Sequence, residues 1–388
     1  MPFRPTDRLK SLPPYLFVEI VRKKQELLAA GKDVIDFGVG DPDRPTPQFI
    51  IDRMTRAVQD AKNHPYPDGR GSQAFREQIG SFFEQRYGVA LDVEREIHAL
   101  IGSKEGLGHL PLAAVNPGQT VLVPEPGYPV YRAAAIFAGG EPWTLELSEA
   151  NRWLPDFASI PEGVARSAAL MNLNYPNNPT GAVATRGFFE DAVAFARRYD
   201  ILIAHDAAYN EMYFDERPPS ILEIDGAKEV AVELHSLSKT FNMTGWRLGF
   251  VAGNADTVAA LGRIKSNLDS GVFTAVQEAG IEAYAGFERP EILDLRELYH
   301  ERAEVLASGL REIGFRVAPP KATFYIWAGV PKGLDTMGTV MKLLDDAAVV
   351  CIPGTGFGAA GQGYVRFALT VELDRIRAAV ARMRELSW

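Results

Sequence analysis

The stretch His235-Ser-Leu-Ser-Lys-Thr-Phe-Asn-Met-Thr-Gly-Trp-Arg-Leu-Gly-Phe250 places one lysine and one arginine between two apolar runs. The runs, Val230–Leu234 and Leu248–Ala252, are typical of buried strands. Lys239 therefore follows a buried strand closely, and burial lowers the pKa of an ammonium group. An amine with a lowered pKa can form a Schiff base with an aldehyde or a ketone. The stretch thus predicts an active-site lysine.

Length, charge and cysteine content narrow the class of protein. The chain has 388 residues, enough for two or three domains, and a net charge of −9. Without an excess of cations to neutralise phosphates, we expect no nucleic-acid partner. We also expect no membrane span and no secretory signal, because no long apolar run is present. Cys351 is the only cysteine and the six histidines form no His-x-x-x-His pair, which predicts no metal site and a cytoplasmic location.

Strand and helix patterns alternate over residues 48–285, which predicts an α/β fold with a mainly parallel sheet between helices. The link between the last two strands has no helical pattern, so we expect the seventh strand to run antiparallel to the others. The candidate strands are Ile97–Ile101, Thr120–Val123, Pro142–Leu147, Ala168–Leu173, Ile201–His205, Val230–Leu234 and Leu248–Ala252. The candidate helices are Pro47–Ala61, Gln73–Arg86, Gly106–Ala114, Val130–Ala138 and Arg186–Arg198.

The two ends of the chain are predicted to form a smaller α/β unit. An amphipathic helix is expected over Tyr15–Ala30, before a Pro- and Gly-rich loop over Gly38–Pro47. The C-terminal elements are a helix over 290–313, a strand over Phe324–Ala328, a helix over Thr336–Ala347, strands over Ala348–Ile352 and Tyr364–Ala368, and a helix over Glu372–Leu386. We expect three parts: 1–46 as an N-terminal arm and part of the small domain, 47–288 as the large ligand-binding domain, and 289–388 as the small C-terminal domain.

Polar side chains follow five of the predicted strands, at the point where each strand ends. In an open parallel sheet, ligands bind beyond the carboxyl ends of the strands, so we expect these side chains to meet at one place. They are Ser103 and Lys104 after the first strand, Tyr128 after the second, Asn178 after the fourth, Asp206 and Tyr209 after the fifth, and Ser236 and Lys239 after the sixth.

Several of these groups suit an anionic, ring-containing ligand, although each also has an ordinary structural explanation. The Gly102–Gly106 turn offers backbone N–H groups at a helix start to a phosphate, but an ordinary capped helix fits equally. Ser236 and Arg247 would complete that phosphate site, whereas Arg247 alone is more often a surface ion-pair residue. Asp206 ends an apolar run, so its carboxylate either pairs with a protonated ring nitrogen or caps a helix.

Three further side chains could contact the ring of such a ligand. Asn178 and Tyr209 could hydrogen-bond a ring oxygen, and Tyr128 could stack on the ring face. A plain turn and ordinary packing are the alternatives. Taken together, an acid for a ring nitrogen, donors for a ring oxygen, a lysine for an aldehyde and a phosphate site fit one cofactor, pyridoxal phosphate.

The motifs Asn178-Pro-Thr-Gly181, Asp206-x-x-Tyr209 and Ser236-x-Ser-Lys239 followed by Arg247 resemble the core motifs of fold-type I pyridoxal-phosphate enzymes, specifically the class I/II aminotransferases. The resemblance implies that Lys239 is the catalytic Schiff-base lysine. The cofactor contacts that it implies are those of Ser103, Lys104, Tyr128, Asn178, Asp206, Tyr209, Ser236, Lys239, Arg247 and Tyr66.

The same resemblance implies substrate contacts and a dimer. Arg366, in Tyr-Val-Arg-Phe-Ala, is similar to the arginine that binds the substrate α-carboxylate, with Gly40 and Asn178 beside it. Tyr66 is similar to a tyrosine that the family sends across a homodimer to the phosphate in the neighbouring subunit. The implied partners are therefore an amino acid, a 2-oxo acid and a second copy of the chain.

Within the family, the segments Arg8–Phe17, Val34–Pro47, Gly102–Gly106 and His235–Arg247 resemble LL-diaminopimelate aminotransferases. This implies transfer between LL-diaminopimelate and a 2-oxo acid such as 2-oxoglutarate, in lysine biosynthesis. Aminotransferases that act on alanine, aspartate, aromatic amino acids or methionine share many of these sequence motifs, and they are the alternatives. No arginine for a short distal carboxylate lies in Ile264–Thr274, which disfavours plain aspartate.

Two motifs and one non-enzyme class compete with this interpretation. Ser236-x-x-Lys239 matches penicillin-recognising hydrolases, but their Ser-Asp-Asn and Lys-Thr-Gly motifs are missing. Gly356-Phe-Gly-Ala-Ala-Gly361 matches a dinucleotide fingerprint, but a strand pattern follows where a helix is required, so we expect a flexible loop. A catalytically inactive regulatory domain of the same fold is disfavoured because no basic patch accompanies it.

Overall fold

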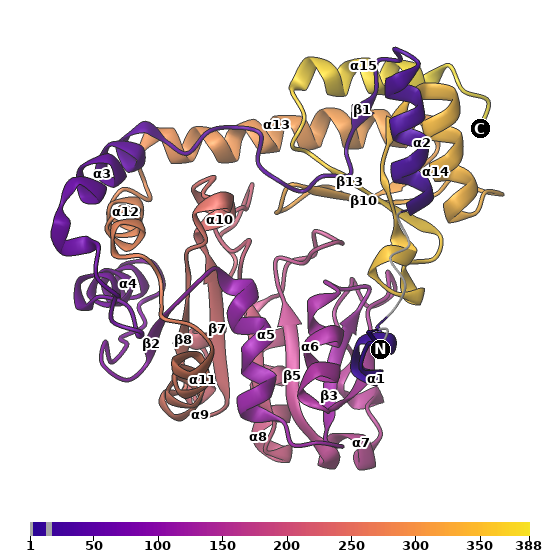
Figure 1. The fold of residues 1–388 in the computed structure, drawn as a ribbon. Helices are drawn as coiled ribbons and strands as arrows, with labels where there is room; N and C mark the ends of the chain where they lie inside the picture. Colours follow the sequence, from indigo (N-terminus) through magenta and orange to yellow (C-terminus); the bar gives the residue numbers. More distant parts are fainter. Residues whose placement is uncertain (1–2, 13–17) are drawn as a thin grey trace.

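The structure is a computed structural model that describes residues 3–12 and 18–388. Its largest sheet has seven strands in the order β2-β8-β7-β6-β5-β3-β4 (Figure 1). Neighbouring strands run parallel except at β8, which is antiparallel to both β2 and β7. The strands are β2 (Ile97–Leu100), β3 (Thr120–Glu125), β4 (Glu141–Glu146), β5 (Ala168–Asn174), β6 (Leu202–Asp206), β7 (Ala231–Ser236) and β8 (Gly249–Gly253). All seven predicted strands and the single antiparallel one are confirmed.

Helices cover both faces of this sheet because both faces of its strands are apolar. Successive strand residues alternate between two cores, as Ile203 and Ala204 do on β6. One core packs on α5 (Ser103–Ala114), α6 (Val130–Ala138) and α11 (Ala255–Leu268). The other packs on α4 (Gln73–Tyr87), α8 (Arg186–Tyr199) and α12 (Thr274–Ala285), with α3 (Gln48–Gln59) beside α12.

A second, four-stranded antiparallel sheet lies across a gap from the first, and α13 (Pro290–Ile313) runs along the top of both (Figure 1). Its order is β12-β13-β10-β9, with β9 (Arg316–Val317), β10 (Tyr325–Gly329), β12 (Ile352–Pro353) and β13 (Tyr364–Ala368). Helices α14 (Thr336–Ala347) and α15 (Leu373–Arg384) share its core. The N-terminal segment joins this part, since β1 (Ile35–Asp36) pairs in parallel with β11 (Val349–Val350).

The remaining elements are short, apart from one N-terminal helix. Helix α2 (Val18–Ala29) confirms most of the helix predicted over 15–30, of which residues 15–17 lie outside the described residues. The others are α1 (Asp7–Lys10), α7 (Glu162–Ser167), α9 (Ala227–Val230), α10 (Leu237–Thr240) and 3-10 turns at Ala61–Asn63, Phe157–Ser159, Ile221–Glu223 and Thr244–Trp246. Within the described ranges, no helix is both long and apolar enough to cross a membrane.

Two predictions about the C-terminal part need correction. The single strand predicted over 348–352 is wrong, because the segment divides at Cys351 between two partners: β11 pairs with β1 and β12 pairs with β13. The loop predicted over 356–361 is two 3-10 turns, Gly354–Phe357 and Ala359–Gly361, whose close backbone contact leaves no room for a Cβ at Gly354 or Gly361. The strand β13 follows them, which confirms that the segment is no dinucleotide fingerprint. The domain boundaries after residues 46 and 288 stay a prediction.

The large sheet packs closely against the start of α5 at Gly249, a glycine on β8. A Cβ placed at Gly249 would lie 2.5 Å from the His235 carbonyl oxygen and 2.8 Å from the Ser103 backbone nitrogen. Because neither backbone atom can move without disturbing the sheet or the helix, Gly249→Ala should lower the free energy of unfolding by about 1–3 kcal/mol. Thermal or urea unfolding measures this change.

Gly245 provides the matched control, since a Cβ there would meet no atom within 4 Å. Gly245→Ala should unfold with the wild-type midpoint. Equal midpoints for Gly249→Ala and the wild type would contradict the packing described here.

Candidate active site

A cavity of about 550 Å³ lies between the carboxyl ends of the large sheet's parallel strands and the smaller sheet. This volume is within the usual range for small-molecule sites. It brings together eleven of the predicted site residues: Gly40, Ser103, Lys104, Tyr128, Asn178, Asp206, Tyr209, Ser236, Lys239, Arg247 and Arg366. Tyr66 is not among the lining residues, and its side chain is 87% exposed.

Lys239 reaches the cavity from α10, the single helical turn that begins directly after β7. The Ser236 hydroxyl accepts a hydrogen bond from the Ser238 N–H and so caps this turn. The Lys239 Nζ donates to the Gly40 carbonyl oxygen at 3.2 Å. Burial, with Arg247 and Arg366 nearby, lowers the pKa of Lys239 to about 8, although the Asp41 carboxylate opposes the shift. The amine is therefore available in its neutral form near physiological pH.

Asp206 lies at the carboxyl end of β6 and is almost fully buried. Burial raises the pKa of its carboxyl, while a hydrogen bond from the Tyr131 hydroxyl to Oδ2, at 2.7 Å, acts against that rise. The Ala208 N–H adds a contact to Oδ1 at 3.3 Å. A buried carboxylate of this kind is stabilised by a cation, and the protonated nitrogen of a pyridine ring would supply one.

The start of α5 and the side chain of Arg247 form an anion site. Gly102 caps the helix with φ of 76° and no side-chain hydrogen bond, so the positive end of the helix dipole faces the cavity at Ser103. The Arg247 guanidinium lies against Gly102 so closely that a Cβ there would collide with it. Lys104 extends over the ring of Tyr128, with Nζ 5.7 Å from the ring centroid. These positive groups suit a phosphate.

Arg366 enters the cavity from β13, on the opposite wall. Its guanidinium is held between the rings of Tyr325 and Phe357, at 4.2 and 4.8 Å from their centroids. It donates to Asn178 Oδ1 at 2.9 Å and to the Gly38 carbonyl oxygen at 3.2 Å. Its buried Nε has no hydrogen-bond partner among the described residues. A fixed guanidinium with unused donor capacity suits a carboxylate.

Three residues that support the site were not singled out by the sequence. Asn174 donates to the Asp206 carbonyl oxygen at 2.8 Å and accepts from the Asn178 N–H at 2.9 Å. Tyr325 places its hydroxyl 3.1 Å from that of Tyr209 and leaves no room for a side chain at Gly40. Tyr131, described above, is the third. Their positions beside the motifs along the chain were visible, but their contacts depend on tertiary pairing.

A fully buried carboxylate beneath the cavity ties β6 to β7. Glu233 accepts hydrogen bonds from His235 at 2.6 Å, from His205 at 3.2 Å and from the Ser220 hydroxyl at 2.8 Å. Although burial alone would raise the pKa of the Glu233 carboxyl, the two histidine hydrogen bonds lower it below its usual value. The histidines directly precede Asp206 and Ser236, so this network fixes the strand ends that carry both site residues.

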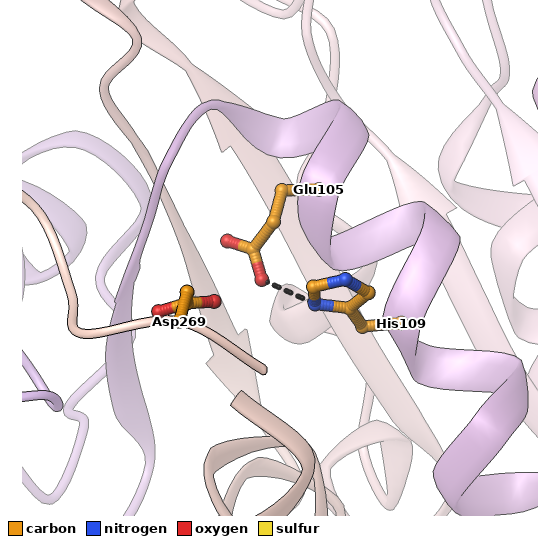
Figure 2. A group of neighbouring side chains, drawn as sticks. All are labelled: Glu105, His109 and Asp269. Atoms are coloured by element: carbon orange, nitrogen blue, oxygen red, sulfur yellow. Dashed lines mark hydrogen bonds and ion pairs between the residues drawn. The ribbon is translucent and has the colours of Figure 1, made fainter. Parts of the chain in front are cut away.

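Another group of acidic and histidine side chains, none of which lines the cavity, lies on α5 and at the end of α11 (Figure 2). His109 and Glu105 on α5 lie 2.7 Å apart, close to Asp269 at the end of α11. The buried ammonium of Lys265 already binds Glu105 at 2.8 Å and Asp269 at 3.1 Å. These ion pairs connect α11 to α5. Because the carboxylates already have a cationic partner within the chain, the group does not indicate a metal site.

The donor set of the cavity fits pyridoxal phosphate. The buried Asp206 carboxylate meets the need of a ring nitrogen, the start of α5 with Arg247 meets that of a phosphate, and Lys239 meets that of an aldehyde. Asn178 and Tyr209 line the same cavity and add an amide and a hydroxyl group to it.

Comparison with known proteins agrees with this chemistry. Residues 32–383 match the family model described as aminotransferase class I and II. The chain is 54% identical to an LL-diaminopimelate aminotransferase of Syntrophobacter fumaroxidans over 100% of both chains, and 50% identical to one of Aquifex aeolicus over 99% of both. Among solved structures, substrate-bound BacF from Bacillus subtilis has a TM-score of 0.93 and 37% identity, covering 99% of this chain and 98% of its own.

The lowered pKa of Lys239 predicts how the protein free of cofactor takes up pyridoxal phosphate. Only the neutral amine attacks an aldehyde, so the uptake rate should rise with pH up to about 8 and then level off. Stopped-flow absorbance measures the rate, and Lys239→Ala should show no covalent phase. A rate that keeps rising to the ordinary lysine pKa of ~10.4 would contradict the role of burial.

Proposed function

The chain belongs to the class I and II aminotransferases, and we propose that it transfers the amino group of LL-diaminopimelate to a 2-oxo acid such as 2-oxoglutarate, in lysine biosynthesis. The choice of substrate is supported by 54% sequence identity, over the full length of both chains, with an LL-diaminopimelate aminotransferase. The cavity supports the reaction class, since a lysine with a lowered pKa and the guanidinium of Arg366 line it together.

Lys239 has the central chemical role in this proposal. When bound, pyridoxal phosphate supplies an aldehyde for the amino group and an electron sink for the substrate Cα. The Lys239 amine would hold the cofactor through its aldehyde and, when free, would take up or return the proton of the substrate Cα. This second task requires a neutral amine, which the pKa of about 8 supports.

The other lining residues position the reacting groups. We assign Asp206 to the ring nitrogen, where its negative charge keeps that nitrogen protonated. Asn178 and Tyr209 hold the ring oxygen, and Tyr128 stacks on the ring. The phosphate contacts are assigned to Ser103, Lys104, Ser236 and Arg247.

Arg366 orients the substrate. A bidentate contact to the α-carboxylate, with Gly40 and Asn178 beside it, would fix the Cα–H bond towards Lys239. The sandwich between Tyr325 and Phe357 keeps the guanidinium plane from rotating, so that the carboxylate is held in one orientation.

Two alternatives follow from the family. An aminotransferase for alanine, aspartate, aromatic amino acids or methionine would use the same cofactor-binding residues, with different residues around the substrate side chain. A catalytically inactive regulatory domain of this fold would keep the cofactor site without turnover. The lowered pKa of Lys239 and the unpaired Nε of Arg366 favour an enzyme over a regulatory domain.

We also propose a homodimer in the cytoplasm. Tyr66 lies outside the cavity of its own chain and is almost fully exposed, as a side chain donated to a neighbouring phosphate site would be in an isolated chain. The lone cysteine, Cys351, is a free buried thiol, which suits a reducing compartment.

A panel of amino donors with 2-oxoglutarate as acceptor tests the proposed reaction. LL-diaminopimelate should give the highest kcat/KM, and glutamate formation reports turnover. Lys239→Ala is the control and should be inactive with every donor. Strong turnover of alanine or phenylalanine with none of diaminopimelate would refute the substrate, while leaving the reaction class intact.

Tyr66 offers a test of the shared site. If its hydroxyl donates to the phosphate in a neighbouring subunit, Tyr66→Phe should weaken cofactor binding by about tenfold, the effect of losing one hydrogen bond to a charged group. Absorbance titration measures the cofactor Kd, and sedimentation should show a dimer. Tyr199→Phe, which alters a tyrosine on α8 that does not line the cavity, is the matched control. A monomer, or equal Kd values, would refute the shared site.

A further inference from the structure

One wall of the cavity carries an ion pair that none of the cofactor or carboxylate contacts uses. Lys24 on α2 donates from Nζ to Asp36 Oδ2 on β1 at 2.6 Å. Both residues line the cavity, and their side chains stay 29% and 21% exposed. The pair is therefore accessible to a ligand while being sheltered enough for its charges to act strongly.

This pair lies on the same wall as the carboxylate-binding arginine. Asp36 Oδ1 accepts from the Gly38 N–H at 2.7 Å, and the Gly38 carbonyl oxygen accepts from Arg366 Nη2 at 3.2 Å. One short backbone segment thus connects the ion pair to Arg366. A substrate held by Arg366 with its Cα towards Lys239 begins next to this segment and can extend along it.

The same cavity also has apolar lining residues on α2 and on the loop after β1. Ile20 and Val21 lie one turn before Lys24 on α2 and line the cavity with it. Val39 adds an exposed apolar side chain from the loop after β1, and it lines the cavity as well. The wall therefore offers a cation for one carboxylate, apolar side chains, and a paired cation and anion.

This set of groups matches a molecule with an α-amino acid at each end and methylene groups between them. We propose that Lys24 and Asp36 form the subsite for the far end of the substrate, with Lys24 binding its carboxylate and Asp36 its ammonium. Each charge of the pair keeps an opposite neighbour when the substrate enters, so no buried charge is left uncompensated. This assignment rests on diaminopimelate as the substrate and names the residues that select it.

Substrates that lack one far-end group separate the two roles. Lysine lacks the far carboxylate and 2-aminopimelate lacks the far amine. Lys24→Gln should lower kcat/KM about ten- to a hundredfold for diaminopimelate and 2-aminopimelate, and leave lysine unchanged. Asp36→Asn, whose Oδ1 can still accept from Gly38, should lower it for diaminopimelate and lysine, and leave 2-aminopimelate unchanged. The loss should appear mainly in KM. Calorimetric binding of pimelate, which has both carboxylates and no amine, should weaken only in Lys24→Gln.

Lys23→Gln is the matched control, because Lys23 is the adjacent lysine on α2 and pairs with Asp345 at 2.9 Å without lining the cavity. It should leave all three substrates unchanged. Equal losses for every substrate in Lys24→Gln, or the same losses in Lys23→Gln, would show that the pair only holds α2 in place and would overturn the inference. Wild-type protein that does not use diaminopimelate would overturn the proposed function itself, an outcome that the variants do not affect.

Discussion

The removal of two charged side chains from water in one cavity is the constraint on which the site depends. Burial disfavours the charged forms of both Lys239 and Asp206, so it lowers the pKa of the amine and raises that of the carboxyl. The two effects have complementary uses. An amine with a lowered pKa can serve as a nucleophile and a proton carrier, while a buried carboxylate is stabilised by a ligand that brings a positive charge. A cofactor with an aldehyde and a basic ring nitrogen relieves both unfavourable burials at once.

Such burial requires a rigid support, and the sheet supplies it. Strand ends β6 and β7 carry Asp206 and Ser236, and the hydrogen bonds of Glu233 lock these strands together from below. Asn174 ties β5 to β6 in the same way. Because buried polar groups are costly when unpaired, a network with this many satisfied hydrogen bonds specifies one arrangement of the strand ends. The opposite wall, with Arg366 and the segment Asp36–Gly40, belongs to the other sheet and the N-terminal segment, so the site is complete only where the two parts meet.

The sequence was sufficient for features that depend on local pattern. Alternating apolar runs predicted all seven strands, and the short link before Leu248 predicted the antiparallel one. Polar residues at strand ends predicted eight of the residues that line the cavity, while Arg247 came from the lysine stretch and Gly40 and Arg366 came from the family resemblance. Contacts made across the fold were not predictable in this way. The tyrosine that supports Asp206 lies on an apolar helix pattern, and the division of residues 348–352 between two sheets depends on partners distant in sequence. Tyr66 is the reverse case, since the role proposed for it rests on the family resemblance and not on its surroundings in one chain.

Locating the covalent attachment point of the cofactor is the direct test of the role proposed for Lys239. Borohydride reduction of the protein with bound pyridoxal phosphate fixes the bond between lysine and cofactor, and mass spectrometry of the digested protein locates it. We expect one phosphopyridoxyl group per chain, on the peptide that contains Lys239. A label on another lysine, such as the neighbouring cavity residue Lys104, or no label at all, would contradict it.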